Sequence, residues 1–217
     1  MEENVRALCT YPMSRSVPAA MIGVLICLGV PAPAYASVIT DWDEKAIAVV
    51  TPLMASFAAN SPYMAQRMMG MVHAAMFDAV NSIERRYRPY LVQLPAERST
   101  SQEAAAATAA ATVLATIDAK TAGEMKVALA TYLESIADGP AKLDGIKLGE
   151  AVAARVVAAR ANDGCYEPDE YRPKTAAGVY VPTAITAASV WPNMKPFAMV
   201  TGSQFRPGPP ISLESKQ

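Results

Sequence analysis

The residues of this 217-residue chain that could do chemistry are few and lie far apart in the sequence. The chain has a single histidine, His73, and no pair of histidines or cysteines at metal-ligand spacing. Acid–base and metal chemistry both require several groups held together. We therefore interpret His73 as a hydrogen-bonded histidine between packed helices, with a direct chemical role as the alternative.

A charged cluster follows on the same predicted helix, made of Glu84, Arg85, Arg86 and Arg88. Cations near a helix C-terminus complement the helix dipole and pair with neighbouring carboxylates such as Asp78 or Glu84. We favour this structural interpretation, and anion binding is the alternative. The sequence contains no glycine-rich phosphate loop and no G-x-S-x-G motif for a nucleophilic serine.

The sulfur-containing side chains favour structure over chemistry. Cys165 follows Gly164 in a predicted loop, and no neighbouring base would activate its thiol. Cys9 and Cys27 fall in a predicted export signal, so the mature chain would have no internal disulfide. One predicted helix is rich in methionines, which fill irregular gaps in a core, and a copper site there would lack histidine or cysteine ligands. These methionines are Met64, Met68, Met69, Met71 and Met76.

The composition predicts an all-α protein. Alanine is abundant, aromatic residues make up 7%, and 52% of the residues are hydrophobic, which favours helices with a sizeable core. The formal net charge is −1, with no excess of basic residues. Nucleic acids and anionic membrane surfaces are therefore not expected as partners.

The first two predicted helices carry the apolar residues of the central core. One begins near Trp42, and Pro52 should kink or end it. The other has Asn60 or Ser61 as its N-cap and Pro62 at its first position, and it runs to about Ile83. Apolar residues recur along it at spacings of three and four, which predicts a largely buried helix.

Three further helices complete a predicted bundle of about five. Capping-box patterns open helices at residues 100–116 and 121–138. The last helix spans about 141–161 and stops at an Asn-Asp-Gly sequence. Its charged residues Arg155 and Arg160 are expected to point to water.

Residues 1–36 are typical of an export signal. Arg6 and Arg15 precede an apolar run at 17–30, and residues 34–36 form a small-x-small cleavage site. The run is shorter than the roughly 20 residues of a membrane span, although an uncleaved anchor remains the alternative. The mature protein is predicted to be periplasmic or secreted, with no membrane association after cleavage.

The predicted helical domain covers residues 37–163, and a proline-rich segment covers 164–217. Eight of the 17 prolines lie between Pro168 and Pro210, which excludes long helices there. We expect an extended segment that packs on the helices or on a missing partner domain. The aromatic residues expected to be buried in this packing are Tyr180, Trp191, Phe197 and Phe205.

Three segments of the chain resemble bacterial vanadium-dependent haloperoxidases of the type-2 phosphatidic-acid-phosphatase superfamily. They are MVHAAMFDAVNSIERRYRPYL at 71–91, GVYVPT at 178–183 and WPNMKPFAMVTGSQFRPGPP at 191–210. The resemblance extends over most of the mature chain. It implies an all-α fold in which related helical halves surround an oxyanion site.

The resemblance also implies a vanadate or phosphate site built from Lys-x6-Arg-Pro, Ser-Gly-His, and a final arginine with a nearby histidine. Such a site supplies clustered cations, donors and a histidine ligand. His73 follows Met71 and Val72, so it is not the histidine of a Ser-Gly-His sequence. The chain has three Arg-Pro pairs, and none has a lysine at the position that Lys-x6-Arg-Pro requires. That position is Asn81 for Arg88-Pro89, Cys165 for Arg172-Pro173 and Met199 for Arg206-Pro207.

We therefore expect no catalytic, cofactor-binding or metal-binding residue in this chain, and vanadate only in the full-length family. The chain is interpreted as the N-terminal half of a haloperoxidase-like protein, inactive alone and shortened by truncation or a frameshift. Its expected partner is the missing catalytic half or a separately encoded chain, and self-association is plausible. The alternative is a stand-alone exported helical module that binds or supports a partner.

Overall fold

The computed structural model describes residues 37–55, 61–168, 170–184, 188–209 and 211. The predicted export signal at 1–36 lies outside these described residues. Among the helices that the structure describes, none is long and apolar enough to cross a membrane.

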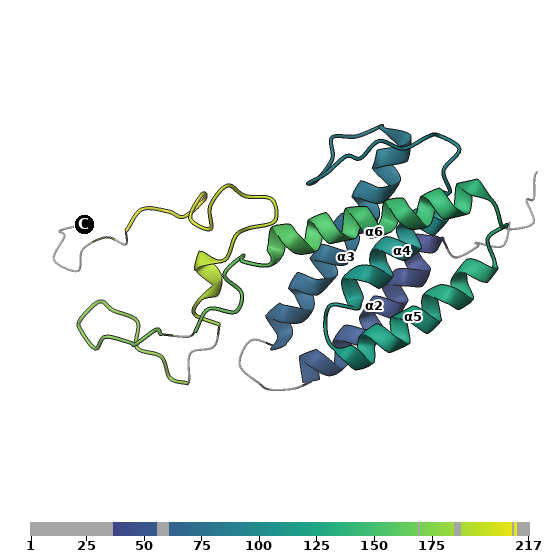
Figure 1. Ribbon diagram of the computed structural model, residues 1–217. Coiled ribbons are helices and arrows are strands. Elements are labelled where there is room, and N and C mark those ends of the chain that lie inside the picture. The colour runs from purple at the N-terminus through teal and green to yellow at the C-terminus, as the bar shows by residue number, and fades with distance from the viewer. Residues whose placement is uncertain (1–36, 56–60, 169, 185–187, 210, 212–217) are drawn as a thin grey trace, which may run out of the picture. The chain divides into compact units, whose positions relative to one another are not determined.

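The described residues form an all-α fold, as the sequence predicts, and no β-strand occurs among them (Figure 1). A short 3₁₀ helix, η1 (Trp191–Asn193), lies in the C-terminal part. The five α-helices are α2 (Val38–Ala55), α3 (Ser61–Glu84), α4 (Gln102–Leu114), α5 (Ala119–Glu134) and α6 (Pro140–Arg160).

Helix α4 is the centre of the bundle and contacts α2, α3, α5 and α6 (Figure 1). Its residues 104–111 are all buried, and seven of these eight are alanine. Such small side chains let neighbouring helices approach closely. Where α6 crosses α4, a Cβ atom on Gly149 would lie 2.5 Å from the carbonyl oxygen of Ala105, so only glycine fits that position.

The predicted helices are all present, but several of their boundaries differ from those observed. Helix α2 begins at Val38 rather than near Trp42, and the N-cap of α4 is Ser101 rather than Thr100. Helix α2 continues past Pro52 to Ala55, so that proline does not end the helix. Helix α5 begins at Ala119, two residues before Thr121, because Asp118 is its N-cap and accepts a hydrogen bond from the Thr121 N–H at 2.7 Å. It ends at Glu134, four residues before the predicted end at 138. An aspartate cap satisfies the same free N–H groups as the threonine that the pattern indicates.

The segment after α6 packs on the bundle through only part of its aromatic residues. Phe197 is partly buried against the core, and Trp191 packs against Tyr63 of α3 with ring centroids 5.2 Å apart. Tyr180 and Phe205 are exposed by 73% and 77%, so they do not pack on the described helices, and their burial against a partner stays a prediction. An aromatic side chain becomes buried only where an apolar surface is in reach, and the described contacts with the core extend to Phe197.

Candidate functional site

Side chains on one face of helix α3 form hydrogen bonds with the irregular segment that follows this helix. Asp78 is fully buried, and its carboxylate accepts hydrogen bonds from the three backbone N–H groups of residues 90–92 at 2.7, 2.8 and 2.9 Å. A buried carboxylate is tolerated when donors of this kind replace its hydration. Asp78 therefore fixes the path of an irregular segment against the helix.

Asn81 and Ser82 extend the same attachment. The amide of Asn81 both donates to the carbonyl oxygen of Tyr87 at 2.8 Å and accepts from its N–H at 2.9 Å. The hydroxyl of Ser82 accepts from the Leu94 N–H at 3.0 Å. Residues three and four positions apart share one helix face, so Asp78, Asn81 and Ser82 act on one adjacent segment.

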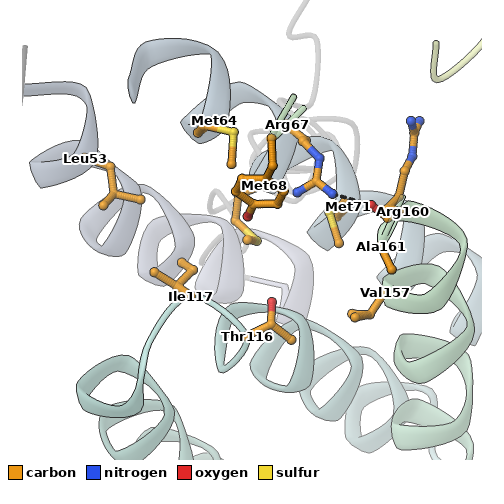
Figure 2. Close-up of a pocket in the computed structure, with 11 residues that line it drawn as sticks. Leu53, Met64, Arg67, Met68, Met71, Thr116, Ile117, Val157, Arg160 and Ala161 are labelled. Atoms are coloured by element: carbon orange, nitrogen blue, oxygen red, sulfur yellow. Dashed lines mark hydrogen bonds between the residues drawn. The ribbon is translucent and has the colours of Figure 1, made fainter. Parts of the chain in front are cut away.

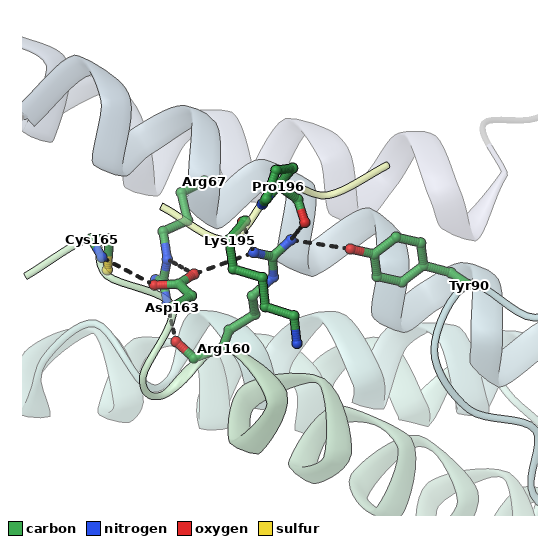
Figure 3. A network of polar contacts seen from close by, with 7 residues as sticks. All are labelled: Arg67, Tyr90, Arg160, Asp163, Cys165, Lys195 and Pro196. Carbon is green, nitrogen blue, oxygen red and sulfur yellow. Dashed lines mark hydrogen bonds and ion pairs between the residues drawn. The ribbon is translucent and has the colours of Figure 1, made fainter. Parts of the chain in front are cut away.

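A second group of buried polar residues joins α3 to the end of α6 (Figure 3). The Arg67 Nε donates to Asp163 Oδ2 at 2.8 Å, and its Nη2 donates to the carbonyl oxygen of Arg160 at 2.7 Å. The Arg160 Nη1 lies 3.5 Å from the same Asp163 Oδ2. Two buried guanidinium groups thus share one buried carboxylate.

Arg160 also binds the segment that returns from the C-terminal part. Its Nη1 donates to the Lys195 carbonyl oxygen at 2.5 Å, and its Nη2 donates to the Pro196 carbonyl oxygen at 3.2 Å and to the Tyr90 hydroxyl at 3.1 Å. The guanidinium carbon lies 3.6 Å from the centre of the Phe197 ring. The Tyr90 and Phe197 rings stack with centroids 6.3 Å apart.

The expectation that Arg160 points to water is therefore wrong, since the residue is only 3% exposed. The spacing of apolar residues on α6 places it at the helix end, where arginine usually meets solvent. Its acceptors come from Asp163, from the Tyr90 region and from residues 195–196, which are remote in the sequence. Arg155, on the same helix, is exposed as expected.

Burial and hydrogen bonding shift two pKa values in this region. Burial raises the pKa of Asp163, but hydrogen bonds from Arg67 and Cys165 and the charge of Arg67 lower it more, so the pKa lies below its ordinary 3.8. Burial and the hydrogen bond to Asp163 raise the pKa of the Cys165 thiol from 9.0 to about 11. At neutral pH Asp163 is a charged acceptor, and Cys165, which is 2% exposed, is a protonated thiol rather than a nucleophile.

A cavity of about 400 Å³ opens beside Arg67 (Figure 2). The guanidinium of Arg67 extends toward Met68 and Met71, whereas the guanidinium of Arg160 lies away from it and only the Arg160 carbonyl oxygen faces Arg67 (Figure 2). The predicted methionine-rich face of α3 thus packs in the core and also lines a cavity. Met68 and Met71 are buried, in agreement with a packing role.

His73 is hydrogen-bonded between two helices, as the sequence predicts. Its Nε2 lies 2.9 Å from Asp43 Oδ1 of α2. The side chains of His73 and Asp43 are 44% and 36% exposed, so the pair lies at the surface. His73 lines a second, mainly apolar cavity of about 600 Å³ together with Met76 and Phe77.

Two residues of the charged cluster at the end of α3, Glu84 and Arg85, contact protein groups. Arg85, with φ 55°, donates to the Ala96 carbonyl oxygen at 2.9 Å. Glu84 accepts from the side chain of Gln102 at 2.5 Å. Among the described residues, no ion pair joins Arg85, Arg86 or Arg88 to Asp78 or Glu84, so the expected pairing with these carboxylates is not observed.

The described residues do not fit a vanadate site. Vanadate needs several cationic donors together with a histidine ligand. The buried donors of Arg160 point to Asp163, to Tyr90 and to main-chain carbonyl groups, and His73 lines a different cavity from Arg67. In the described ranges, no three His, Cys, Asp or Glu residues are grouped so as to hold a metal ion.

Comparison with protein-family models, curated proteins and solved structures finds no match for this chain.

The sequence does not indicate which residues these polar side chains bind in the folded protein. Nothing in the sequence indicates that Arg67 pairs with Asp163, which lies 96 positions later, or that Asp43 pairs with His73. A buried-type position for Arg67 could have been inferred from its place among Met64, Met68 and Met71 on the apolar face of α3.

Proposed function

We propose that this chain is the helical N-terminal half of an exported vanadium-dependent haloperoxidase-like protein. In this proposal the whole protein uses vanadate and hydrogen peroxide to oxidise halide, or hydrolyses phosphate esters at the same kind of site. The chain itself is a scaffold that positions and covers a catalytic half. It is inactive alone because the residues for binding vanadate are absent from its sequence.

The observation that carries this proposal is the contact between two of the segments that resemble the family. Residues 71–91 and 191–210 are about a hundred positions apart, yet Tyr90 of the first stacks on Phe197 of the second. Arg160 donates hydrogen bonds to Tyr90 and to the main chain at residues 195–196. The two resembling segments thus form one structural unit, as a scaffold role requires. The first of them, residues 71–91, also contains Asp78, Asn81 and Ser82.

The partner in this proposal is the catalytic half, either on the same chain or separately encoded. Its contact surface includes the exposed apolar residues of the C-terminal part, which favour burial against another protein surface. A homo-oligomer is a further way to cover them. The most exposed are Tyr166, Tyr180, Val200, Phe205 and Ile211.

The proposal is tested by reading the coding DNA beyond the codon for Gln217 in all three forward frames. We expect Lys-x6-Arg-Pro followed by Ser-Gly-His in one of them. The purified 217-residue chain should then show no vanadate-dependent bromination, whereas the chain co-expressed with the downstream half should show it. Bromination by the chain alone would refute the scaffold role, and the absence of those sequences in every frame would refute the family assignment.

A stand-alone exported helical binding module is the second candidate, and the cavity of about 400 Å³ beside Arg67 favours it. Pockets of roughly 300–1,000 Å³ hold small molecules in many proteins. A monomer in which residues 164–198 resist protease would support this candidate. An aggregating preparation that a co-expressed partner makes soluble would support the scaffold instead.

A further inference from the structure

The cavity beside Arg67 contains a buried donor that the protein leaves unused. Arg67 is 5% exposed, and its Nε and Nη2 donate to Asp163 and to the Arg160 carbonyl oxygen. Its Nη1 has no hydrogen-bond partner among the described residues, and it is not one of the fully enclosed side-chain atoms without a partner. This nitrogen therefore has accessible surface, and we infer that it faces the cavity that Arg67 lines.

The charges around this donor are unbalanced. Arg67 and Arg160 are both buried and pair with the single carboxylate of Asp163, which leaves one positive charge. No other carboxylate of the described residues forms an ion pair with either guanidinium. A buried charge is costly unless it is paired, so a bound monoanion at Nη1 would be strongly favoured.

The rest of the cavity wall decides what kind of anion fits. A small hydrated inorganic anion would lose its water against apolar side chains and gain few donors in return. A carboxylate with an apolar chain instead matches both parts, because guanidinium groups bind carboxylates well and thioether and aliphatic side chains accommodate the chain. The apolar lining includes Leu53, Met64, Met68, Met71, Ile117 and Val157, and the ring of Tyr166 also lies in the cavity wall.

We propose that this cavity binds a small carboxylic acid with an apolar tail, such as a medium-chain fatty acid. The carboxylate accepts a hydrogen bond from Arg67 Nη1, and the tail lies between α3 and α6 against the methionines. This site is independent of the oxyanion site of a haloperoxidase and does not depend on the scaffold role.

Isothermal titration calorimetry of the full chain with octanoate tests the proposal, with 1-octanol and acetate as matched ligands. We expect octanoate to bind about tenfold more tightly than 1-octanol, because a charged hydrogen bond is lost in the alcohol. Acetate should bind weakly, since it has no tail. The Val157→Phe variant fills the cavity while keeping the Arg67–Asp163 ion pair, and it should reduce octanoate affinity by about tenfold or more.

Arg155→Gln is the control, because Arg155 is an exposed cation on the same helix. Its octanoate affinity should equal that of the unaltered chain. Arg67→Gln should abolish the preference for octanoate over 1-octanol. If Arg67→Gln fails to fold, the proposal is tested by the comparison of octanoate with 1-octanol and by the Val157→Phe variant. The proposal is wrong if the unaltered chain does not bind octanoate, if 1-octanol binds equally well, or if a folded Val157→Phe retains full affinity.

Discussion

Single buried polar side chains determine how the irregular parts of this chain lie on its helices. Asp78 alone accepts three backbone hydrogen bonds, and Arg160 alone donates to two backbone carbonyl groups and a tyrosine hydroxyl. Irregular segments have main-chain groups that no helix or sheet satisfies. A few charged residues at fixed positions on α3 and α6 therefore replace regular secondary structure as the source of order.

Replacing Asp78 with alanine should destabilise the protein by about 3 kcal/mol, because three N–H groups lose a charged acceptor. Urea unfolding followed by circular dichroism measures this change. Asp144→Ala is the matched control, since Asp144 is exposed and lies 3.8 Å from Lys147, and it should change stability by less than about 1 kcal/mol. Equal effects of the two substitutions would contradict the role given to Asp78.

The Cys165 thiol should resist alkylation in the folded protein. Its pKa is raised to about 11, so the thiolate is scarce below that pH, and the side chain is buried. Because folding favours the protonated thiol, Cys165 contributes to the free energy of unfolding at pH values below its ordinary pKa of 9.0. This contribution is lost as the pH rises through about 11. Mass spectrometry of the Cys165 peptide after iodoacetamide treatment measures the labelling. Labelling should be slow without urea and fast in urea. Fast labelling of the folded protein at neutral pH would show that the thiol is accessible and would contradict this prediction.

At the scale of elements, the helices could be predicted from the sequence but their contacts could not. Apolar spacing, Pro62 and capping patterns locate five helices, because these signals act within a few residues. The alanine-rich sequence of α4 permits close helix packing, but it does not say which helices pack on it, because those partners lie elsewhere in the sequence. The same limit explains the misassigned Arg160, whose acceptors lie elsewhere in the sequence.

Gly149→Ala tests the close crossing of α4 and α6. The new methyl group would lie 2.5 Å from the Ala105 carbonyl oxygen and 2.8 Å from Thr108 Cβ, so we expect a loss of about 2 kcal/mol in stability. Gly123→Ala on α5 is the control, because a Cβ there meets nothing within 4 Å. It should stabilise the protein by about 1 kcal/mol, since alanine favours helix over glycine. Thermal unfolding of both variants measures the contrast, and a stabilising Gly149→Ala would mean that the helices pack less closely than described.

At the scale of the whole molecule, the question is where the folded domain ends. The sequence predicts a boundary at residue 163, where the last α-helix stops and proline becomes frequent. The contacts of Arg160 with residues 195–196 and the packing of Phe197 connect the following segment to the bundle. Beyond Phe197, the described residues 198–209 and 211 are exposed.

Two truncations distinguish these boundaries. A chain ending at Ala198 keeps every described contact of Arg160, so its stability should lie within about 0.5 kcal/mol of the full chain. A chain ending at Ser189 removes the carbonyl acceptors of Arg160 and the Phe197 ring, and it should lose about 2–3 kcal/mol. Urea unfolding of the two chains measures the difference. If both chains retain full stability, the folded domain ends near residue 163 and the segment after it is a linker. If only the shorter chain is less stable, residues 190–198 belong to the fold and any partner surface begins after them.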